Sequence, residues 1–255
     1  MKNEAIYKEG RAYPYHFFWS KLEQIEQIYR LRKGMLVVGT CGDEREVLWG
    51  VQELSVLKSG LEQIKQKYSP FIFRYGGVLN QVLQQYPQII RWGYNLKTIH
   101  VGYELAMEEL SISSQSGTDI SPLRVNDIDT LLKLNEELFS IFRFSRQEAE
   151  HAVNSPDEHV FIMTVDKKLV GFVFARTSPH GFIRNLGVHP AVRRQGFGEK
   201  LMNHVLRVFQ EQGITRCTLW IEHDNLAARK LYEKIGFKLD ESEAEAVFFH
   251  EKRSL

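Results

Sequence analysis

The chain has 255 residues and a formal net charge of +1, from 33 Lys and Arg against 32 Asp and Glu. Hydrophobic residues make up 43% and charged residues 25%, as in ordinary globular proteins. This composition excludes collagen-like, low-complexity and disordered chains, because there is enough apolar material to offset the entropy of ordering the backbone. The balanced charge also argues against nucleic acid as a partner, since nucleic-acid binding usually leaves a basic footprint.

The cysteine content and the start of the chain bear on its compartment. Cys41 and Cys217 are too few for a disulfide framework. The first ten residues, MKNEAIYKEG, lack the apolar core of a secretory signal, and nowhere do about 18 apolar residues follow one another to span a membrane. We therefore expect a reduced, soluble, cytoplasmic protein with no membrane partner.

The polar, aperiodic segment SISSQSGT at residues 111–118 separates two regularly patterned halves. We expect an N-terminal lobe over 1–110, a linker over 111–118 and a C-terminal domain over 119–255. A chain of this length is also near the size at which one hydrophobic core tends to split into two.

The first half predicts an α/β lobe. Ser20 and Glu23 form a capping-box signal for a helix that ends at Gly34. The elements expected next are strands at 35–40 and 46–54, a helix opening at Ser59 and Glu62, a strand at 71–74, a helix around 78–86 and a strand at 96–108. No catalytic constellation stands out in this half, which by itself does not indicate a function.

The second half also alternates strands and helices, as expected of a mixed α/β sheet. The expected strands are 122–125, 159–165, 169–177, 182–188, 217–222 and two closing strands at 237–241 and 244–251. The expected helices are 127–138, one capped by Ser145, one carrying an apolar stripe from Leu201 to Phe209 and ending at Gly213, and 225–236.

The segment between the third of these strands and its helix carries the clearest chemical signal. Arg193 to Gly198 reads R-x-x-G-x-G at a helix start. Glycines let the backbone approach a ligand closely, and the first N–H groups of a helix lack internal partners, so such an end binds phosphate. A tight strand-to-helix turn is the simpler alternative. The spacing fits neither a Walker loop nor a dinucleotide-binding fingerprint.

Two downstream residues favour the ligand interpretation. Asn225 is a natural helix N-cap, and Tyr232 lies two helical turns later on the same face. The combined pattern is V-x-P-x-x-R-x-x-G-x-G followed by N-x-A-A-x-x-L-Y-x-x-x-G-F. Over residues 117–255 the chain thereby resembles the GNAT N-acetyltransferase superfamily.

The resemblance implies an enzyme that uses acetyl-CoA as co-substrate and holds no metal. Backbone groups of Leu186 and Val188 would pair with the pantetheine arm, Val188 N–H would polarise the thioester carbonyl, and Tyr232 would act as general acid at the sulfur. The implied cofactor-binding set is Leu186, Gly187, Val188, Arg193, Arg194, Gln195, Gly196, Phe197, Gly198, Glu199, Asn225 and Ala228.

The general base is where the sequence departs from the family. A carboxylate common in the family falls on Phe182 here. Glu222 is the first candidate in its place, with His223 and Asn185 behind it. A solvated strand-end charge is the alternative for Glu222, and a chain of ordered waters could take the proton without any side chain.

The first half of the chain allows two interpretations. Its element order matches a GNAT domain with pieces missing, which predicts a degenerate, non-catalytic GNAT-like lobe. The alternative is an unrelated α/β domain that shapes the acceptor pocket or the oligomer. For the whole chain we expect acetyl transfer to a primary amine of a small molecule or peptide, by a monomer or homodimer. The alternative is a non-catalytic acyl-CoA-binding sensor.

Overall fold

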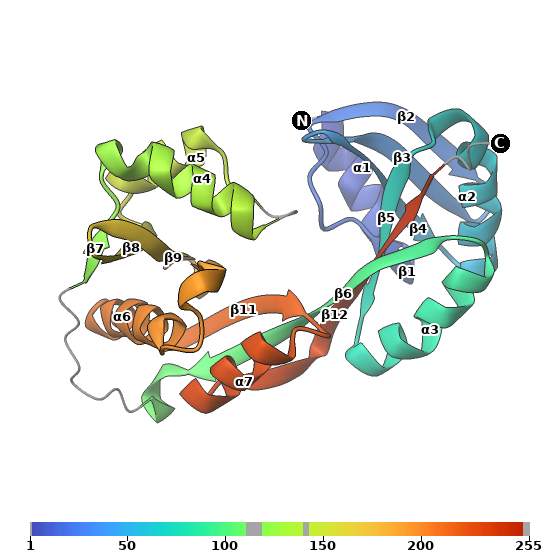
Figure 1. Ribbon diagram of the computed structural model, residues 1–255. Helices are drawn as coiled ribbons and strands as arrows, with labels where there is room; N and C mark the ends of the chain where they lie inside the picture. The colour runs from blue at the N-terminus through green and yellow to red at the C-terminus, as the bar shows by residue number, and fades with distance from the viewer. Residues whose placement is uncertain (1, 111–118, 140–142, 252–255) are drawn as a thin grey trace. The chain divides into compact units, whose positions relative to one another are not determined.

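The computed structural model describes residues 2–110, 119–139 and 143–251 (Figure 1). Its contacts divide the chain into two compact units: Met1–Val101, Glu222–Asp224 and Glu241–Leu255 form the first, and Gly102–Ile221 with Asn225–Asp240 form the second. Both units consist of several separate segments of the sequence, whereas the predicted division has a single linker between two continuous halves. The predicted linker lies outside the described residues, so the predicted domain boundaries stay predictions.

The second unit is a mixed sheet with helices on both faces, which confirms the predicted fold class (Figure 1). Its strands lie in the order β7 (Ile120–Pro122), β8 (Glu158–Val165), β9 (Lys168–Arg176), β10 (Gly181–Val188), β11 (Arg216–Glu222) and β6 (Asn95–Ala106). Its helices are α4 (Ile128–Leu138), α5 (Arg146–Asn154), α6 (Phe197–Glu211) and α7 (Leu226–Ile235). β10 runs parallel to β11 and antiparallel to β9.

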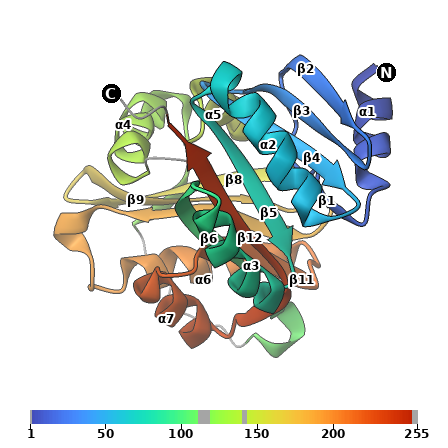
Figure 2. The same ribbon diagram turned by 90° about the vertical axis from the view of Figure 1, so that its right-hand side faces the viewer.

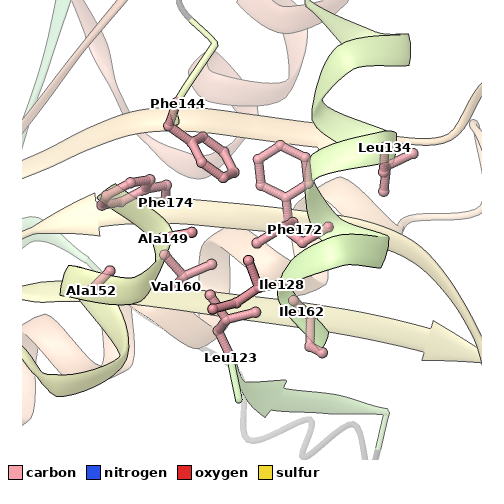
Figure 3. Close-up of a cluster of buried hydrophobic side chains, with 11 residues drawn as sticks. Leu123, Ile128, Leu134, Phe144, Ala149, Ala152, Val160, Ile162, Phe172 and Phe174 are labelled. Carbon is pink, nitrogen blue, oxygen red and sulfur yellow. The ribbon is translucent and has the colours of Figure 1, made fainter. Parts of the chain in front are cut away.

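Helices α4 and α5 pack on one face of this sheet through a cluster of buried apolar side chains (Figure 3). Phe144 stands edge-on to Phe172 and Phe174, with ring centroids 5.5 and 5.4 Å apart. The predicted cap of α5 is confirmed, because Ser145 and Glu148 form a complete capping box. The apolar stripe of α6 from Leu201 to Phe209 is buried as predicted.

The first unit is likewise built from mixed parallel and antiparallel strands with helices (Figure 2). Its strands are β2 (Gln24–Leu31), β3 (Gly34–Cys41), β4 (Glu44–Val51), β5 (Phe71–Gly77), β12 (Lys238–His250) and β6, in that spatial order, and β1 (Tyr15–Phe17) pairs with β4. Its helices are α1 (Lys2–Arg11), α2 (Leu54–Tyr68) and α3 (Leu79–Arg91). None of the helices in the described parts of the chain is long and apolar enough to cross a membrane.

The predicted helix from Ser20 to Gly34 is wrong. Residues Gln24–Leu31 form strand β2, which pairs with β3 as far as Leu31↔Gly34. Ile25, Ile28 and Tyr29 do recur at helical spacing, but pairing with β3 overrides that weak local preference. A register shift between Ile25 and Gln27 explains why the apolar residues miss the strict alternation of a strand.

Three further elements differ from the prediction. Helix α1 is not foreseen, and α2 begins at Leu54, ahead of the Ser59–Glu62 signal. The two closing strands are one continuous strand, β12. No glycine or proline interrupts Lys238–His250, so nothing in the backbone stops the strand between its two predicted halves.

Candidate active site

The site lies where β10 and β11 separate. Their parallel pairing joins Gly181 to Cys217, Phe182 to Thr218 and Ile183 to Leu219. On its other side β10 stays paired with β9 as far as Val188↔Gly171. After Ile183, β10 therefore stays paired with β9 along one edge, whereas the described pairing with β11 along the other edge has ended.

The direction of the backbone groups on that edge follows from one hydrogen bond. His189 N–H donates to the Val170 carbonyl on β9 at 2.8 Å. Successive N–H groups of a strand point to opposite edges, so Leu186 and Val188 N–H point away from β9. The Val188 carbonyl shares that edge, and there it accepts a hydrogen bond from Arg193 Nε at 2.9 Å.

The start of α6 faces the same place. Gly196 is its N-cap and has φ +80, a left-handed conformation that glycine adopts without strain. The first helical hydrogen bond runs from Lys200 N to Gly196 O at 3.0 Å, so the N–H groups of residues 197–199 have no partner within the helix. A Cβ on Gly198 would lie 3.3 Å from Leu231 Cδ2, which shows how closely α6 and α7 approach here.

Charged side chains border this helix start. Arg193 and Arg194 are both exposed, and Arg194 has φ +66. Glu199, in the first turn of α6, forms an ion pair of 2.7 Å with Lys234 of α7. The two arginines therefore leave cationic groups close to the N-terminus of a helix, where the helix dipole already favours an anion.

Helix α7 is placed by its caps. Asn225 Oδ1 accepts a hydrogen bond from Ala228 N at 3.1 Å, which confirms the predicted N-cap. Gly236 ends the helix with φ +114. This placement puts Tyr232 on the buried side, where its ring packs edge-on against Phe237 with centroids 5.8 Å apart.

Tyr232 is buried, with 6% of its surface exposed. Burial raises the pKa of its phenol well above the ordinary value of 10, and the nearby thiol of Cys217 raises that pKa further. The phenol is therefore a protonated donor at any ordinary pH.

These parts line an open cavity of about 390 Å³, within the range typical of small-molecule sites. It brings together every predicted cofactor-binding residue except Gln195, and Tyr232 with them. The lining residues that the sequence did not indicate are Leu138, Phe139, Val192, Ala227 and Leu231. Leu138 and Phe139, at the end of α4, carry no local signal, because only the packing of α4 on the sheet brings them beside Gly187.

The candidates for the general base lie elsewhere. Glu222 is the exposed last residue of β11 and is not among the described residues that line the cavity. Asn185 is buried in β10, and His223 N–H donates to the Ile99 carbonyl at 2.7 Å. The guanidinium of Arg176 lies over the ring of Phe182, and its Cζ is 5.1 Å from the centroid of that ring. The base thus stays a prediction.

One set of contacts that sequence reasoning missed holds α7 against β6. Tyr103 is buried, its hydroxyl donates to Glu233 Oε1 at 3.0 Å, and Arg229 Nε donates to the same hydroxyl at 3.0 Å. Glu233 directly follows Tyr232, so this link sets the rotation of the helix that carries Tyr232. Residues so far apart in sequence give no pattern by which the link could be found.

Replacing Tyr103 with Phe keeps the ring and removes the hydroxyl that joins Arg229 and Glu233. We expect the free energy of unfolding to fall by about 1 kcal/mol, because the two charged side chains are partly exposed and water replaces part of the lost bonding. Urea unfolding measures the change, and an unaltered midpoint would show that the link contributes nothing.

Known proteins resemble this chain over the residues that build the site. Residues 128–237 match the family model described as "Acetyltransferase (GNAT) family". The chain is 28% identical over 122 residues to the [ribosomal protein bS18]-alanine N-acetyltransferase of Escherichia coli K12, covering 46% of this chain and 79% of that protein. It is 29% identical over 126 residues to the mycothiol acetyltransferase of Jonesia denitrificans, covering 44% of this chain and 40% of that protein. The match thus spans less than half the length of that relative.

Among solved structures, the GCN5-related N-acetyltransferase from Sphaerobacter thermophilus has a TM-score of 0.62 at 15% identity, covering 90% of this chain and 84% of that one. A functionally unknown conserved protein from Staphylococcus epidermidis gives 0.61 at 16% identity, covering 89% and 94%. At these identities the likeness concerns the fold. It extends over most of the chain and is not confined to the residues of the family model.

Proposed function

Because residues 128–237 are a GNAT acetyltransferase domain, we propose that this protein moves the acetyl group of acetyl-CoA to a primary amine of a small molecule or peptide. The observation that carries the proposal is the cavity between the free edge of β10, the start of α6 and the buried face of α7. By their names, one of these relatives is an alanine N-acetyltransferase for ribosomal protein bS18 and the other is a mycothiol acetyltransferase, and the acceptor of this chain is a separate question.

The residues present fit acetyl-CoA. The unpaired β10 edge at Leu186 and Val188 offers the pantetheine amides a strand to bond with, and the N–H groups at the start of α6 suit the pyrophosphate. Arg194 and Gln195 extend from the same loop, and Gln195 is assigned to the phosphates only by its place in the motif. Asn225 and Ala228 line the cavity and would flank the pantetheine arm.

The chemistry assigned to these groups is a direct transfer. The amine nitrogen forms a bond to the acetyl carbon, the carbon–sulfur bond breaks, the nitrogen loses a proton and the thiolate gains one. Val188 N–H points toward the separation between β10 and β11, where it would stabilise the charge that develops on the carbonyl oxygen. Tyr232, kept protonated by burial, would give the proton to the thiolate.

The attacking amine must be neutral, although a lysine-like amine has a pKa near 10.4. We assign the removal of its proton to Glu222, as the sequence predicts. Glu222→Gln should then lower kcat/KM by roughly 100-fold at neutral pH, with CoA affinity kept. Steady-state rates of thiol release, with CoA titrations beside them, test this. Wild-type rates in the variant would assign the proton to water instead.

Release of free thiol from acetyl-CoA across a panel of amines tests the proposed function. The panel contains polyamines, aminoglycosides, amino acids and peptides with free N-termini, and a reaction without amine gives the background. Amine-dependent thiol release is the expected result. Binding of acetyl-CoA with no turnover on any amine would favour the sensor alternative.

Composition supports the remaining parts of the proposal. Balanced charge predicts that neither nucleic acid nor a membrane is a partner, and two unpaired cysteines predict a reducing, cytoplasmic location. A monomer or homodimer is the predicted state.

A further inference from the structure

The first unit repeats the order of elements that builds the site of the second unit. In the second unit, antiparallel strands β8, β9 and β10 lead through α6 to β11, which is parallel to β10, and then to α7 and a final strand. In the first unit, β2, β3 and β4 lead through α2 to β5, which is parallel to β4, and then to α3 and a final strand. Strands β4 and β5 thus correspond to β10 and β11.

The parallel strands of the first unit also separate. Pairing joins Glu46 to Ile72 and Val47 to Phe73, whereas β4 continues to Val51. The second unit keeps its cavity beside the equivalent part of β10. The first unit therefore has a counterpart of the cleft in which we propose that acyl-CoA binds.

A strand from the start of the chain fills that counterpart. β1 pairs antiparallel with the end of β4, through Tyr15↔Val51, His16↔Gly50 and Phe17↔Trp49 (Figure 2). It contacts β5 as well, since a Cβ on Gly76 would lie 3.1 Å from Phe17 Cε2. β1 thus occupies the gap between the two strands and bonds to the β4 edge that would otherwise be unpaired.

The end of β1 is tightly packed. Phe17 and Phe18 are 3% and 0% exposed. Arg11 Nη2 donates to the Phe18 carbonyl at 2.9 Å, and a Cβ on Gly50 would lie 2.4 Å from the Gly10 carbonyl oxygen. Such contacts leave no room for a second chain-like ligand along this part of β4.

The first unit lacks counterparts of the loop and helix start to which we assign the phosphates. In the first unit only Gln52 and Glu53 join β4 to α2, whereas in the second unit residues 189–196 join β10 to α6. Glu53 is the N-cap of α2, and a hydrogen bond from Lys33 lowers its pKa, so it places a carboxylate where the second unit presents N–H groups. The N-cap of α3 is Val78, and the position that corresponds to Tyr232 is Gln85.

We infer that the first unit contains a second cleft of the acyl-CoA-binding type, which the chain's own residues Tyr15–Phe17 fill as an internal strand. Each chain would then bind one acyl-CoA. The stoichiometry rests on the proposed function of the second unit, whereas the occupation of the first cleft does not.

Calorimetric titration of the full chain with CoA tests the stoichiometry. One CoA per chain is expected, and none is expected for Gly198→Trp. Two CoA per wild-type chain, of which one remains in Gly198→Trp, would overturn the inference and leave the proposed function standing. If the wild-type chain does not bind CoA, the proposed function is overturned. Hydrogen exchange then tests the filled cleft by itself.

Hydrogen exchange of the full chain tests the filled cleft directly. We expect the amides of Tyr15 and Phe17, and those of residues 49–51, to exchange as slowly as those of β3, with or without CoA. Phe17→Ala should speed exchange at Tyr15 and residue 17 at least tenfold, and Tyr15→Ala, which removes a half-exposed ring, should not speed exchange at Phe17. Fast exchange in the wild-type chain, or protection of 49–51 that appears only with CoA, would contradict the inference, and this readout stands even if Phe17→Ala fails to fold.

Discussion

Gly198→Trp is expected to weaken CoA binding at least 100-fold, which corresponds to about 2.8 kcal/mol. Gly198 lies in the first turn of α6, where a Cβ already comes within 3.3 Å of Leu231 Cδ2 and within 4.0 Å of Leu186 and Val188 side-chain atoms. An indole at this position would fill the cavity that we assign to the pantetheine and pyrophosphate. Isothermal titration calorimetry with CoA measures the loss.

Gly198→Ala is the matched control for this prediction. Gly198 has no left-handed φ, so alanine fits the helical backbone, and a single methyl group needs only a small shift of Leu231. We expect this variant to retain CoA binding and both variants to keep the thermal midpoint of the wild type within a few degrees. Unchanged binding in a folded Gly198→Trp protein would refute the assignment of the loop.

Tyr232→Phe is expected to lower kcat by roughly 100-fold or more, while the dissociation constant of CoA changes little. The substitution removes one hydroxyl and keeps the ring that packs on Phe237. If the hydroxyl protonates the leaving thiolate, its loss acts on the transition state and not on the binding of the ground state. Initial rates of thiol release at saturating acetyl-CoA, with CoA titrations beside them, separate the two effects.

The pH dependence gives a second readout for Tyr232. Burial raises the pKa of the phenol above 10, and a raised pKa keeps the proton on at every pH below it. The wild-type rate should therefore show no fall due to this group between pH 7 and about 10. Tyr75→Phe makes the same change at a buried tyrosine of the first unit and should leave kcat unaltered. Equal kcat in wild type and Tyr232→Phe would remove the acid role.

Much of the site could be predicted because its signals are local. The glycines of the loop, the Asn225 cap and the spacing from Asn225 to Tyr232 each depend on residues within two helical turns, and the structure gathers them around one cavity. Capping and helical periodicity arise from hydrogen bonds between near neighbours, so a single sequence displays them.

The errors fall where distant segments decide the outcome. Residues 24–31 become a strand because β3 is there to pair with them, and Lys238–His250 stays one strand although its polar middle suggests a break. The cap signal of Ser20 is likewise misleading, since its hydroxyl donates to Glu46 instead. Local preferences of a few tenths of a kcal/mol cannot compete with a ladder of strand pairs.

The sequence by itself determined the class of fold, the helix start suited to phosphate and the tyrosine beside it. Only the tertiary structure decided that β10 parts from β11 while staying paired with β9, that Leu138 and Phe139 close the cavity, and that β1 lies in the matching gap of the first unit. The first group follows from contacts within a few residues along the chain. The second depends on which strand finds which edge, and the free energy of that pairing appears only when segments far apart in sequence meet.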